Sequence, residues 1–207
     1  MHTQAHFWDK RARSYSQKPV PDQEVYEKKL ALTRTLLNPE MEVLEIGCGT
    51  GTTALFHSPF VKHITATDYS SEMISIAKEK ATQKAITNVD FQVESIEAMN
   101  YPDKTFDMVM AHSILHLLPD PETTLRTIYD ALKPGGHFVS STVCIKDFSR
   151  LMSWILPIGH RIGIFPFVNS FSSEWLLNRL TDTGFAIQQQ WKPKSSTIFI
   201  IAKKPEA

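Results

Sequence analysis

Val43-Leu44-Glu45-Ile46-Gly47-Cys48-Gly49-Thr50-Gly51 is a short apolar run that ends in three glycines at alternate positions. The apolar residues predict a buried strand over 42–46, and the glycines predict a tight turn into a helix. Glycine allows such a turn and, because it has no Cβ, lets a ligand lie against the main chain. In open α/β sheets ligands bind at the carboxyl ends of the strands, so we predict a ligand-binding turn here. A plain turn without a ligand is the alternative.

Further short strands and helices alternate after this turn. Strands are expected at 64–67, 89–93, 106–111 and 137–143, and helices at 71–84 and 121–132. Brief strands rich in β-branched and aromatic residues, with helices between them, are typical of a parallel sheet with crossover connections. Pro134-Gly135-Gly136 is expected to end the second helix and to turn the chain into the fifth strand.

The last part of the chain breaks this alternation. A helix is expected at 173–183, and strands at 185–191 and 197–202 are joined by Lys192 to Ser196. That link is too short for a crossover, so it predicts an antiparallel hairpin. The fold class is therefore α/β: a doubly wound, seven-stranded, mostly parallel sheet with one antiparallel strand at or near an edge and helices on both faces.

The length of 207 residues fits one domain. We predict a single domain over 1–207 that consists of four segments. These are an N-terminal helical cap over 1–40 with a helix around 22–37, a cofactor-binding core over 41–145, an apolar insertion or lid over 146–171, and a C-terminal helix and hairpin over 172–207.

The charge balance limits the classes of partner. Lysine plus arginine is 22 and aspartate plus glutamate is 22, so the formal net charge is zero. Such a chain has no global field to attract nucleic acid or an anionic membrane, although a local patch is not excluded. The Asn/Asp-Pro-Pro-Tyr/Phe/Trp motif, which often holds a target base, is absent from the sequence. We therefore expect no nucleic-acid partner.

Two cysteines, Cys48 and Cys144, cannot build a disulfide framework and are expected to be buried small apolar residues. Residues 1–10 lack the apolar core of a secretory signal, so a reducing, cytoplasmic location is the simplest expectation. No run of about 18 apolar residues is free of charge, so no stable membrane insertion is expected.

Two carboxylates flank the glycine turn. Glu45 lies two residues before the first glycine, and Asp68 ends the second predicted strand, where a carboxylate can bind both hydroxyls of a ribose. A pyrophosphate site requires Gly-x-Gly-x-x-Gly, whereas this turn is Gly-x-Gly-x-Gly followed by Thr52. The pattern favours a nucleoside ligand with a cationic group. Glu45 as a cap of the turn and Asp68 as a helix-start residue are the alternatives.

The chain carries five motifs in a fixed order: VLEIGCGTG at 43–51, TATDYS at 65–70, YPDKTFD at 101–107, LHLLPDP at 115–121 and KPGG at 133–136. In this set it resembles the class I S-adenosylmethionine-dependent methyltransferases with a Rossmann-like fold. It is similar above all to their small-molecule type, which includes ubiquinone and menaquinone methyltransferases. The resemblance implies S-adenosyl-L-methionine as the cofactor, S-adenosyl-L-homocysteine as its product, and no metal.

The resemblance also implies roles for single residues. Gly47, Cys48 and Gly49 would support the methionine moiety, with Glu45 near its ammonium group. Asp68 would bind the ribose hydroxyls.

Further cofactor contacts are implied on other elements. Tyr69 and Met73 would line the ribose and the adenine, and Ile96 would pack on the adenine ring. Ser95 stands where the family commonly has an aspartate that accepts from the adenine amino group, and an ordinary surface serine is the alternative. The remaining implied contacts come from the N-terminal segment and from the end of the fourth strand: Tyr15, Ala111 and His112.

His116 and His112 are the candidate catalytic residues. The sulfonium methyl group is already electrophilic, so the main task of the protein is to align the acceptor and to exclude water. A general base helps only if the acceptor carries a proton that must leave. A structural role for His116 is the alternative. A metal site is not expected, because no glutamate follows His112 and no third ligand has suitable spacing.

The insertion over 146–171 is apolar and aromatic and has no clear period. Insertions of this kind often cover substrates, and an aromatic, Met-bearing cover suits a flat or apolar acceptor. A dimer contact or a helix pair packed on the core is the alternative. We expect a small-molecule acceptor as the partner and either a monomer or a homodimer.

These expectations describe an enzyme that transfers a methyl group from S-adenosyl-L-methionine to an oxygen, nitrogen or carbon atom of a small, apolar or aromatic acceptor. The alternative is a non-catalytic module that keeps the nucleoside pocket as a binding or regulatory subunit, which Ser95 supports. An NAD-dependent oxidoreductase is disfavoured by Thr52 and Glu45.

Overall fold

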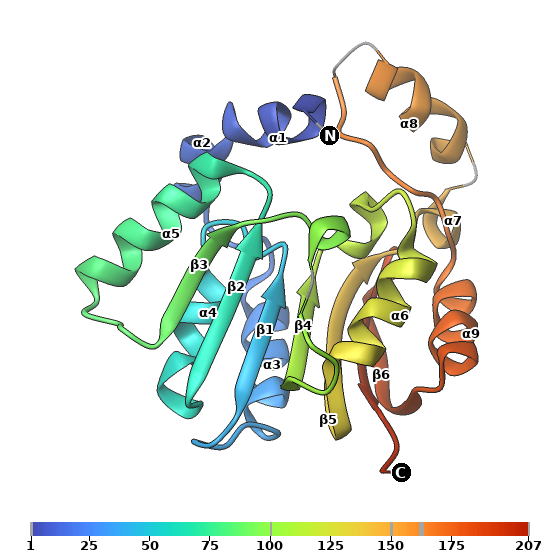
Figure 1. The fold of residues 1–207 in the computed structure, drawn as a ribbon. Coiled ribbons are helices and arrows are strands. Elements are labelled where there is room, and N and C mark those ends of the chain that lie inside the picture. The colour runs from blue at the N-terminus through green and yellow to red at the C-terminus, as the bar shows by residue number, and fades with distance from the viewer. Residues whose placement is uncertain (1, 100, 150, 162–163, 207) are drawn as a thin grey trace. The chain divides into compact units, whose positions relative to one another are not determined.

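The structure is a computed structural model that describes residues 2–99, 101–149, 151–161 and 164–206. The strands in this part of the chain are β1 (Glu42–Ile46), β2 (His63–Asp68), β3 (Val89–Val93), β4 (Phe106–His112), β5 (Leu132–Val143), β6 (Ala186–Lys194) and β7 (Thr197–Lys203). They form a seven-stranded mixed sheet in the order β3-β2-β1-β4-β5-β7-β6, and helices surround it (Figure 1). β7 runs antiparallel to both of its neighbours, β5 and β6. The predicted fold class is confirmed.

The chain divides into two compact units, Met1–Asn100 and Tyr101–Ala207. This division falls inside the predicted core over 41–145. The prediction of a single domain with four segments stays a prediction.

The first unit contains the parallel strands β1, β2 and β3. Ile46 pairs with Thr67, and Asp68 pairs with Val93, so the strands end at a common edge. Its helices after β1 are α4 (Thr52–His57), the 3-10 helix η1 (Ser58–Phe60), α5 (Ser71–Gln83) and the 3-10 helix η2 (Ile96–Ala98). The strand boundaries match the predicted ones to within one residue, β2 being one residue longer at each end, because each strand is a short apolar run between turn residues.

α5 connects β2 to β3 and packs against both strands. It begins at Ser70, whose Oγ accepts a hydrogen bond from the Met73 N–H at 3.2 Å and so satisfies one free donor of the first turn. The apolar face of the helix is buried, as its spacing predicts. The buried side chains are Met73, Ile74, Ile76, Ala77 and Ala81.

Three helices precede β1: α1 (His2–Asp9), α2 (Ala12–Ser16) and α3 (Gln23–Arg34). α1 and α2 pack against α5, and α3 packs against α4. Trp8 packs against a small buried cluster of Ala12, Met73 and Ile76. The N-terminal helices therefore cover the start of α5, and the predicted helix around 22–37 is present in a shorter form.

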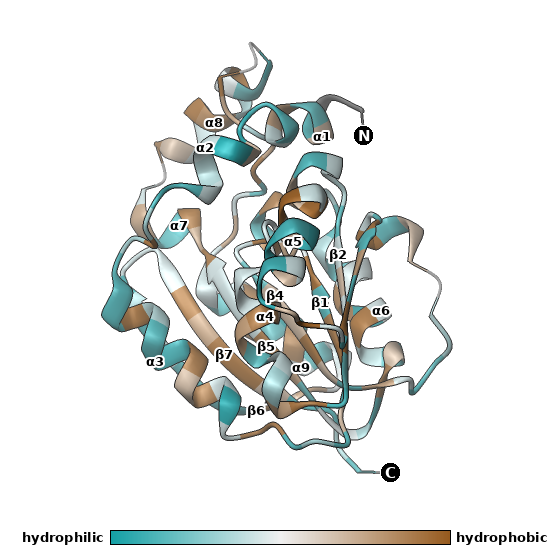
Figure 2. Ribbon diagram, turned by 90° about the vertical axis from the view of Figure 1, so that its left-hand side faces the viewer, coloured by the Kyte–Doolittle hydropathy of each residue, from teal (hydrophilic) through white to brown (hydrophobic). Residues whose placement is uncertain are grey.

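The second unit pairs β4 with β5 in parallel and β7 with both β5 and β6 in antiparallel fashion. Its helices include the 3-10 helix η3 (Leu115–Leu117), α6 (Pro121–Ala131) and α9 (Ser173–Thr183), which pack near β5, β6 and β7. Asp120 caps α6, because its Oδ1 accepts from the Thr123 N–H at 3.0 Å. The ribbon of β7 is brown along most of its length in Figure 2, which agrees with its buried residues 198–202.

Two predicted boundaries in the second unit are wrong. β5 begins at Leu132, directly after α6, so Pro134-Gly135-Gly136 belongs to the strand and not to a turn before it. The Gly135 N–H donates to the Lys204 carbonyl at 3.0 Å, and the Lys204 N–H donates to the Gly136 carbonyl at 2.9 Å. Pairing with the distant C-terminal segment extends the strand. Similarly, β6 runs to Lys194, so Ser195 and Ser196 alone form the hairpin link.

The insertion contains two helices, α7 (Ile145–Phe148) and α8 (Met152–Arg161). Pro157 lies inside α8, and this proline together with apolar residues on both sides of the helix hides its period in the sequence. Arg150, Ile162 and Gly163, which belong to the predicted insertion, lie outside the described residues. None of the helices in the described ranges is long and apolar enough to cross a membrane.

Candidate functional site

The glycine turn after β1 has a left-handed backbone. The angle φ is 63° at Gly47, 54° at Gly49 and 73° at Gly51. The left-handed region costs about 1–2 kcal/mol for a residue with a Cβ, so glycine is favoured at all three positions. The Cys48 N–H donates to the Thr67 carbonyl of β2 at 2.9 Å, which ties the turn to the neighbouring strand.

The glycines at 49 and 51 have different surroundings. A Cβ at Gly51 would lie 2.7 Å from ring atoms of Phe91 and 2.9 Å from the Cβ of Ala77. A Cβ at Gly49 would meet nothing within 4 Å. Gly51 is therefore required for close packing of the turn, whereas Gly49 borders open space. A ligand at the turn needs this kind of space beside the main chain.

Glu45 is buried in β1 directly before the turn. Its side chain is 2% exposed, and Glu45 Oε2 has no hydrogen-bond partner among the described residues. Burial, opposed by the Ala54 N–H and reinforced by the charge of Asp68, raises the pKa of Glu45 to about 8. An unpaired buried carboxyl group is unfavourable unless a cation or a donor reaches it. Glu45 therefore fits a cationic ligand group better than a role as a satisfied cap.

Asp68 lies at the end of β2 and binds two backbone N–H groups. Its Oδ2 accepts from the Gly49 N–H at 2.9 Å, and its Oδ1 accepts from the Ser70 N–H at 2.9 Å. Burial raises the pKa of Asp68, and the same two N–H groups oppose this shift. Since Ser70 is the residue that caps α5, Asp68 is not a plain helix cap. It connects the glycine turn to the entry of α5.

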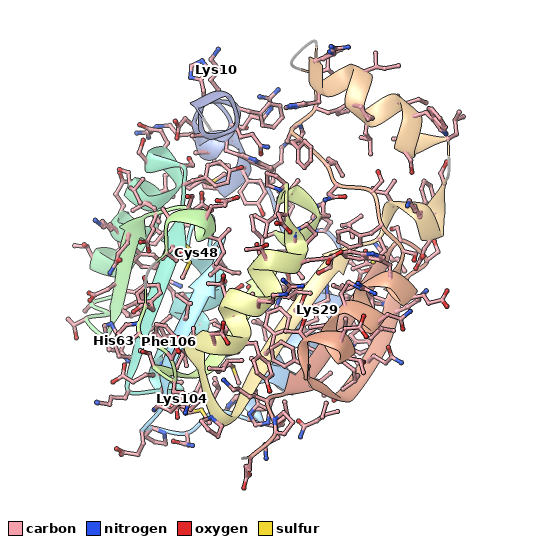
Figure 3. The ribbon with its side chains drawn as sticks, turned by 45° about the vertical axis from the view of Figure 1, so that its right-hand side comes forward. Lys10, Lys29, Cys48, His63, Lys104 and Phe106 are labelled. Atoms are coloured by element: carbon pink, nitrogen blue, oxygen red, sulfur yellow. The ribbon has the colours of Figure 1, made fainter. Side chains whose placement is uncertain are left out.

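Cys48, labelled in Figure 3, is buried in the middle of the turn. Burial, followed by the charges of Glu45 and Asp68, raises the pKa of its thiol well above the ordinary value. The thiol therefore stays protonated and behaves as a small apolar group. Cys144 is also buried, in the second unit.

The N-terminal helices are fastened to the entry of α5. Asp9 Oδ1 accepts from Ser70 Oγ at 2.6 Å and from the Glu72 N–H at 3.2 Å. Tyr69 donates from its hydroxyl to Gln4 Oε1 at 3.4 Å. The carboxylate of Asp9 therefore adds a second cap, beside the Ser70 hydroxyl, to the first turn of α5, next to the predicted ribose-binding residue.

Three predicted cofactor contacts lie around this attachment. Tyr15 is half exposed, and its pKa is raised by burial and by the charge of Asp68. Burial and the charge of Asp68 also raise the pKa of Tyr69. Met73 is 3% exposed and packs against Ala12 in the buried cluster. The structure thus places these side chains in the same part of the first unit as Asp68.

Two residues that the sequence did not suggest also face the turn. Lys80 Nζ reaches from α5 to Thr50, donating to its Oγ1 at 2.8 Å and its carbonyl at 3.2 Å, and to Thr52 Oγ1 at 3.3 Å. Tyr26 of α3 lies 3.4 Å from Thr53 Oγ1, measured from its hydroxyl. Burial raises the pKa of Tyr26, and the charges of Glu45 and Tyr15 add to the shift. Lys80 and Tyr26 therefore border the turn from two helices.

Ser95 and Ile96 follow β3 at the same edge of the first unit. The Ser95 carbonyl accepts from the Ala98 N–H at 3.0 Å as the chain enters η2, and its side chain does not cap this helix. Ser95 is half-buried, and Ile96 is 8% exposed. Their predicted contacts with adenine stay predictions.

The predicted residues of the second unit lie at the end of β4 and in η3. Ala111 is fully buried, and His112 is the last residue of β4. His116 lies in η3, and its Nδ1 is buried without a hydrogen-bond partner among the described residues. Burial lowers the pKa of His116 to about 4, so its imidazole is neutral at pH 7. The His116 carbonyl accepts from the Asn169 N–H at 2.7 Å.

No group of three or more His, Cys, Asp or Glu side chains within the described ranges could hold a metal ion. The predicted roles of Ala111, His112 and His116 stay predictions.

A family model described as "Methyltransferase domain" matches residues 37–196. This range covers more than half of the chain, so the chain belongs to this methyltransferase family. The resemblance expected from its five motifs is confirmed.

Curated proteins include similar methyltransferases. YcgJ of Bacillus subtilis, named an uncharacterized methyltransferase, is 35% identical over 100 residues, which are 48% of this chain and 40% of that protein. The ubiquinone biosynthesis O-methyltransferase of Coxiella burnetii is 32% identical over 127 residues, which are 60% of this chain and 52% of that protein. The chain therefore spans about half the length of the curated relatives it matches.

Solved structures share the fold. The crystal structure of YcgJ has a TM-score of 0.73 at 20% identity and covers 87% of this chain and 100% of that chain. A geranyl diphosphate C-methyltransferase from Streptomyces coelicolor, solved with Mg²⁺, geranyl diphosphate and S-adenosyl-L-homocysteine, has a TM-score of 0.72 at 13% identity. The match covers 88% of this chain and 80% of that chain. At such identities the likeness shows the fold alone.

Replacing Gly51 and Gly49 with alanine should distinguish the cost of disturbed packing from the cost of backbone strain in the free energy of unfolding. Gly51→Ala combines a left-handed alanine with displacement of the Phe91 ring, so we expect a loss of about 2–5 kcal/mol in the free energy of unfolding. Gly49→Ala is the matched control, because only the backbone term of about 1–2 kcal/mol applies. Urea denaturation followed by circular dichroism measures both. Equal losses would contradict the packing role of Gly51.

Proposed function

We propose that this chain binds S-adenosyl-L-methionine at the glycine turn of its first unit and transfers its methyl group to a small, apolar or aromatic acceptor. Membership of the methyltransferase family supports the reaction class. One observation carries the cofactor assignment: Glu45 Oε2 is buried without a partner among the described residues, directly before a left-handed glycine turn.

The residues at the turn fit the amino-acid end of this cofactor. An ammonium group beside Glu45 would give the buried carboxylate the counter-charge that it lacks. The open space at Gly49 admits a ligand against the main chain. A diphosphate would instead meet the two carboxylates Glu45 and Asp68, so the arrangement opposes a dinucleotide.

Asp68 is the proposed ribose-binding residue. Each of its oxygens accepts one backbone N–H and retains a second acceptor position, so two neighbouring hydroxyls can donate to it. Tyr15, Tyr69 and Met73 lie in the same part of the unit and are proposed to line the nucleoside. Ser95 and Ile96 are proposed to border the adenine. A neutral serine would accept a weaker hydrogen bond from the adenine amino group than an aspartate would.

The bound cofactor supplies a methyl group on a sulfonium sulfur that is already electrophilic. The residues of this chain then have three tasks: to bind the amino-acid and ribose groups, to orient them and to keep water away. The helices α1 and α2 are proposed to exclude water on the side of Tyr15. His116 is proposed to accept a proton at Nδ1 when the acceptor carries one, since its imidazole is neutral and Nδ1 has no partner among the described residues.

An acceptor of apolar or aromatic character is supported by the aromatic insertion and by the relative that acts in ubiquinone biosynthesis. In the alternative function, the chain is a non-catalytic module that binds the cofactor in the same pocket but transfers no methyl group. The test is calorimetry with S-adenosyl-L-homocysteine, followed by methyl transfer from labelled cofactor to a panel of phenols, aryl amines and fatty acids. Tight binding without transfer to any acceptor would favour the module.

Asp68→Asn should weaken S-adenosyl-L-homocysteine binding by about 1–3 kcal/mol, because the variant loses the charge that strengthens hydrogen bonds to the ribose. The dissociation constant from calorimetry is the measurement. Asp90→Asn is the matched control, since Asp90 lies exposed on the neighbouring β3 and pairs with His63. An unchanged constant for Asp68→Asn would contradict the ribose assignment.

Glu45 should release a proton when the cofactor binds. With a pKa of about 8 the free protein holds a proton at Glu45 at pH 7, and a neighbouring ammonium lowers that pKa. The affinity for S-adenosyl-L-homocysteine should therefore rise from pH 6 to about pH 8. Calorimetry at pH 7 in phosphate and in Tris should give different binding enthalpies, and Glu45→Gln should remove the difference.

The same group should make the free protein less stable at high pH. Its pKa is raised from 4.5 to about 8, so the folded state binds more protons than the unfolded state between these values. The contribution of Glu45 to stability is therefore complete below pH 4.5 and is lost as the pH rises to about 8. If the free energy of unfolding of Glu45→Gln changed with pH as steeply as that of the wild type, this would contradict a buried, unpaired Glu45.

His116→Ala should leave the dissociation constant of S-adenosyl-L-homocysteine unchanged, because His116 has no proposed cofactor contact. For an acceptor with a proton to lose, kcat should fall in the variant, and the wild-type rate should rise with pH through the pKa of about 4. The pH–rate profile measures this. A flat wild-type profile with such an acceptor would remove the base role.

A further inference from the structure

An exposed apolar stripe runs along α8 in the second unit. We define the α8 stripe as Leu151 and the three helix residues Trp154, Ile155 and Ile158, whose exposed fractions are 67%, 77%, 42% and 65%. Their spacing is i, i+3, i+4 and i+7, which places them on one face of a helix. Phe148 before the stripe and Ile164 after it are also exposed.

The opposite side of α8 is already packed. Leu156 and Gly159 are buried, and a Cβ at Gly159 would collide with the ring of Phe165. The stripe is therefore an outer face and not an inner face that awaits the core. In Figure 1 α8 stands apart from the strands of its unit, joined to them through α7. A contiguous apolar surface of this kind marks a contact with another molecule or with a membrane.

Charge distinguishes the possible occupants. From Phe148 to Ser173 the sequence contains Arg150 and Arg161 but no aspartate or glutamate. The acidic residue before this segment, Asp147, accepts from Lys192 Nζ at 2.9 Å and from the Ser173 N–H at 3.2 Å, so its charge is compensated. The segment that carries the α8 stripe thus has a net positive charge in its sequence, although the whole chain is neutral.

This combination fits the surface of an anionic bilayer. An interfacial helix lies in the plane of the headgroups with its apolar face down and its basic residues near anionic lipids. α8 has 10 residues, so it is too short to cross and can only lie along the surface. Trp154 is the most exposed large apolar side chain of the stripe, and tryptophan is enriched at membrane interfaces. A second copy would bring a segment of the same positive charge against the first.

We propose that the α8 stripe docks this chain reversibly on bilayers that contain anionic phospholipid. The apolar side chains enter the boundary between headgroups and acyl chains, and the basic residues attract the anionic headgroups. This docking is independent of cofactor binding at the glycine turn.

Vesicle co-sedimentation of the full chain tests the proposal. The probes are vesicles of phosphatidylcholine alone and of phosphatidylcholine with 30% phosphatidylglycerol, at low and high salt. We expect at least about tenfold stronger binding to the anionic vesicles, reduced by salt, with a blue shift of tryptophan fluorescence. Ile158→Glu should weaken binding at least about tenfold, because it places a charge in the apolar face. Val93→Glu is the control, since Val93 is 56% exposed on β3 of the other unit.

Folding and self-association are measured in parallel. Thermal unfolding and S-adenosyl-L-homocysteine binding of Ile158→Glu should match the wild type, which separates docking from the proposed function. The proposal is overturned if the wild type stays in the supernatant with anionic vesicles, if it binds neutral vesicles equally well, or if Val93→Glu weakens binding as much as Ile158→Glu. Light scattering that shows a dimer broken by Ile158→Glu, without vesicle binding, would assign the stripe to a second copy.

Discussion

The two hydrogen bonds that Asp68 accepts hold the candidate site of the first unit together. One comes from the glycine turn after β1 and the other from the entry of α5, so a single carboxylate sets the positions of two elements that follow different strands. Lys80 adds a second link, from the last turn of α5 back to Thr50. Because these contacts use backbone groups and short side chains, the turn has little freedom to rearrange. A ligand meets a preformed surface, which lowers the entropy lost on binding.

Much of this site was predictable because its residues lie at strand ends. Gly47 to Gly51, Glu45 and Asp68 follow short apolar runs, and parallel strands of one sheet end at a common edge. Lys80 and Tyr26 were not predictable in this way. Both lie on helices, where lysine and tyrosine are ordinary surface residues, and only the packing of α5 and α3 brings them to the turn. The burial that leaves Glu45 Oε2 unpaired is likewise a property of the packed unit.

The errors in the second unit have a related cause. β5 begins at Leu132, which pairs with Phe106 of β4, and the glycines that follow it bond to Lys204, which is distant in sequence. A helix pair in the insertion was only an alternative, and the bounds of α8 were not predicted, because Pro157 and apolar residues on both sides of the helix conceal its period. Local patterns predict elements whose partners lie close along the chain. They fail where tertiary contacts decide where an element begins, as at β5. The family and the fold were accessible from the motifs, whereas no motif identifies the acceptor, and local patterns are weakest in the insertion.

The capping of α5 by Asp9 makes the N-terminal segment a separable part of the first unit. Asp9 accepts two hydrogen bonds, and these bonds together with the small cluster around Trp8 fasten α1 and α2, whereas the strands of the first unit are held by their own pairing. Detaching the segment therefore requires only local opening, and the free energy of this opening is far below that of unfolding the unit. Such opening would leave the Glu72 N–H without its acceptor and would expose Met73 to water. The glycine turn and Asp68 would stay in place. The fold thus separates the glycine turn and Asp68, which the strands of the first unit hold in place, from a helical segment that can open by itself.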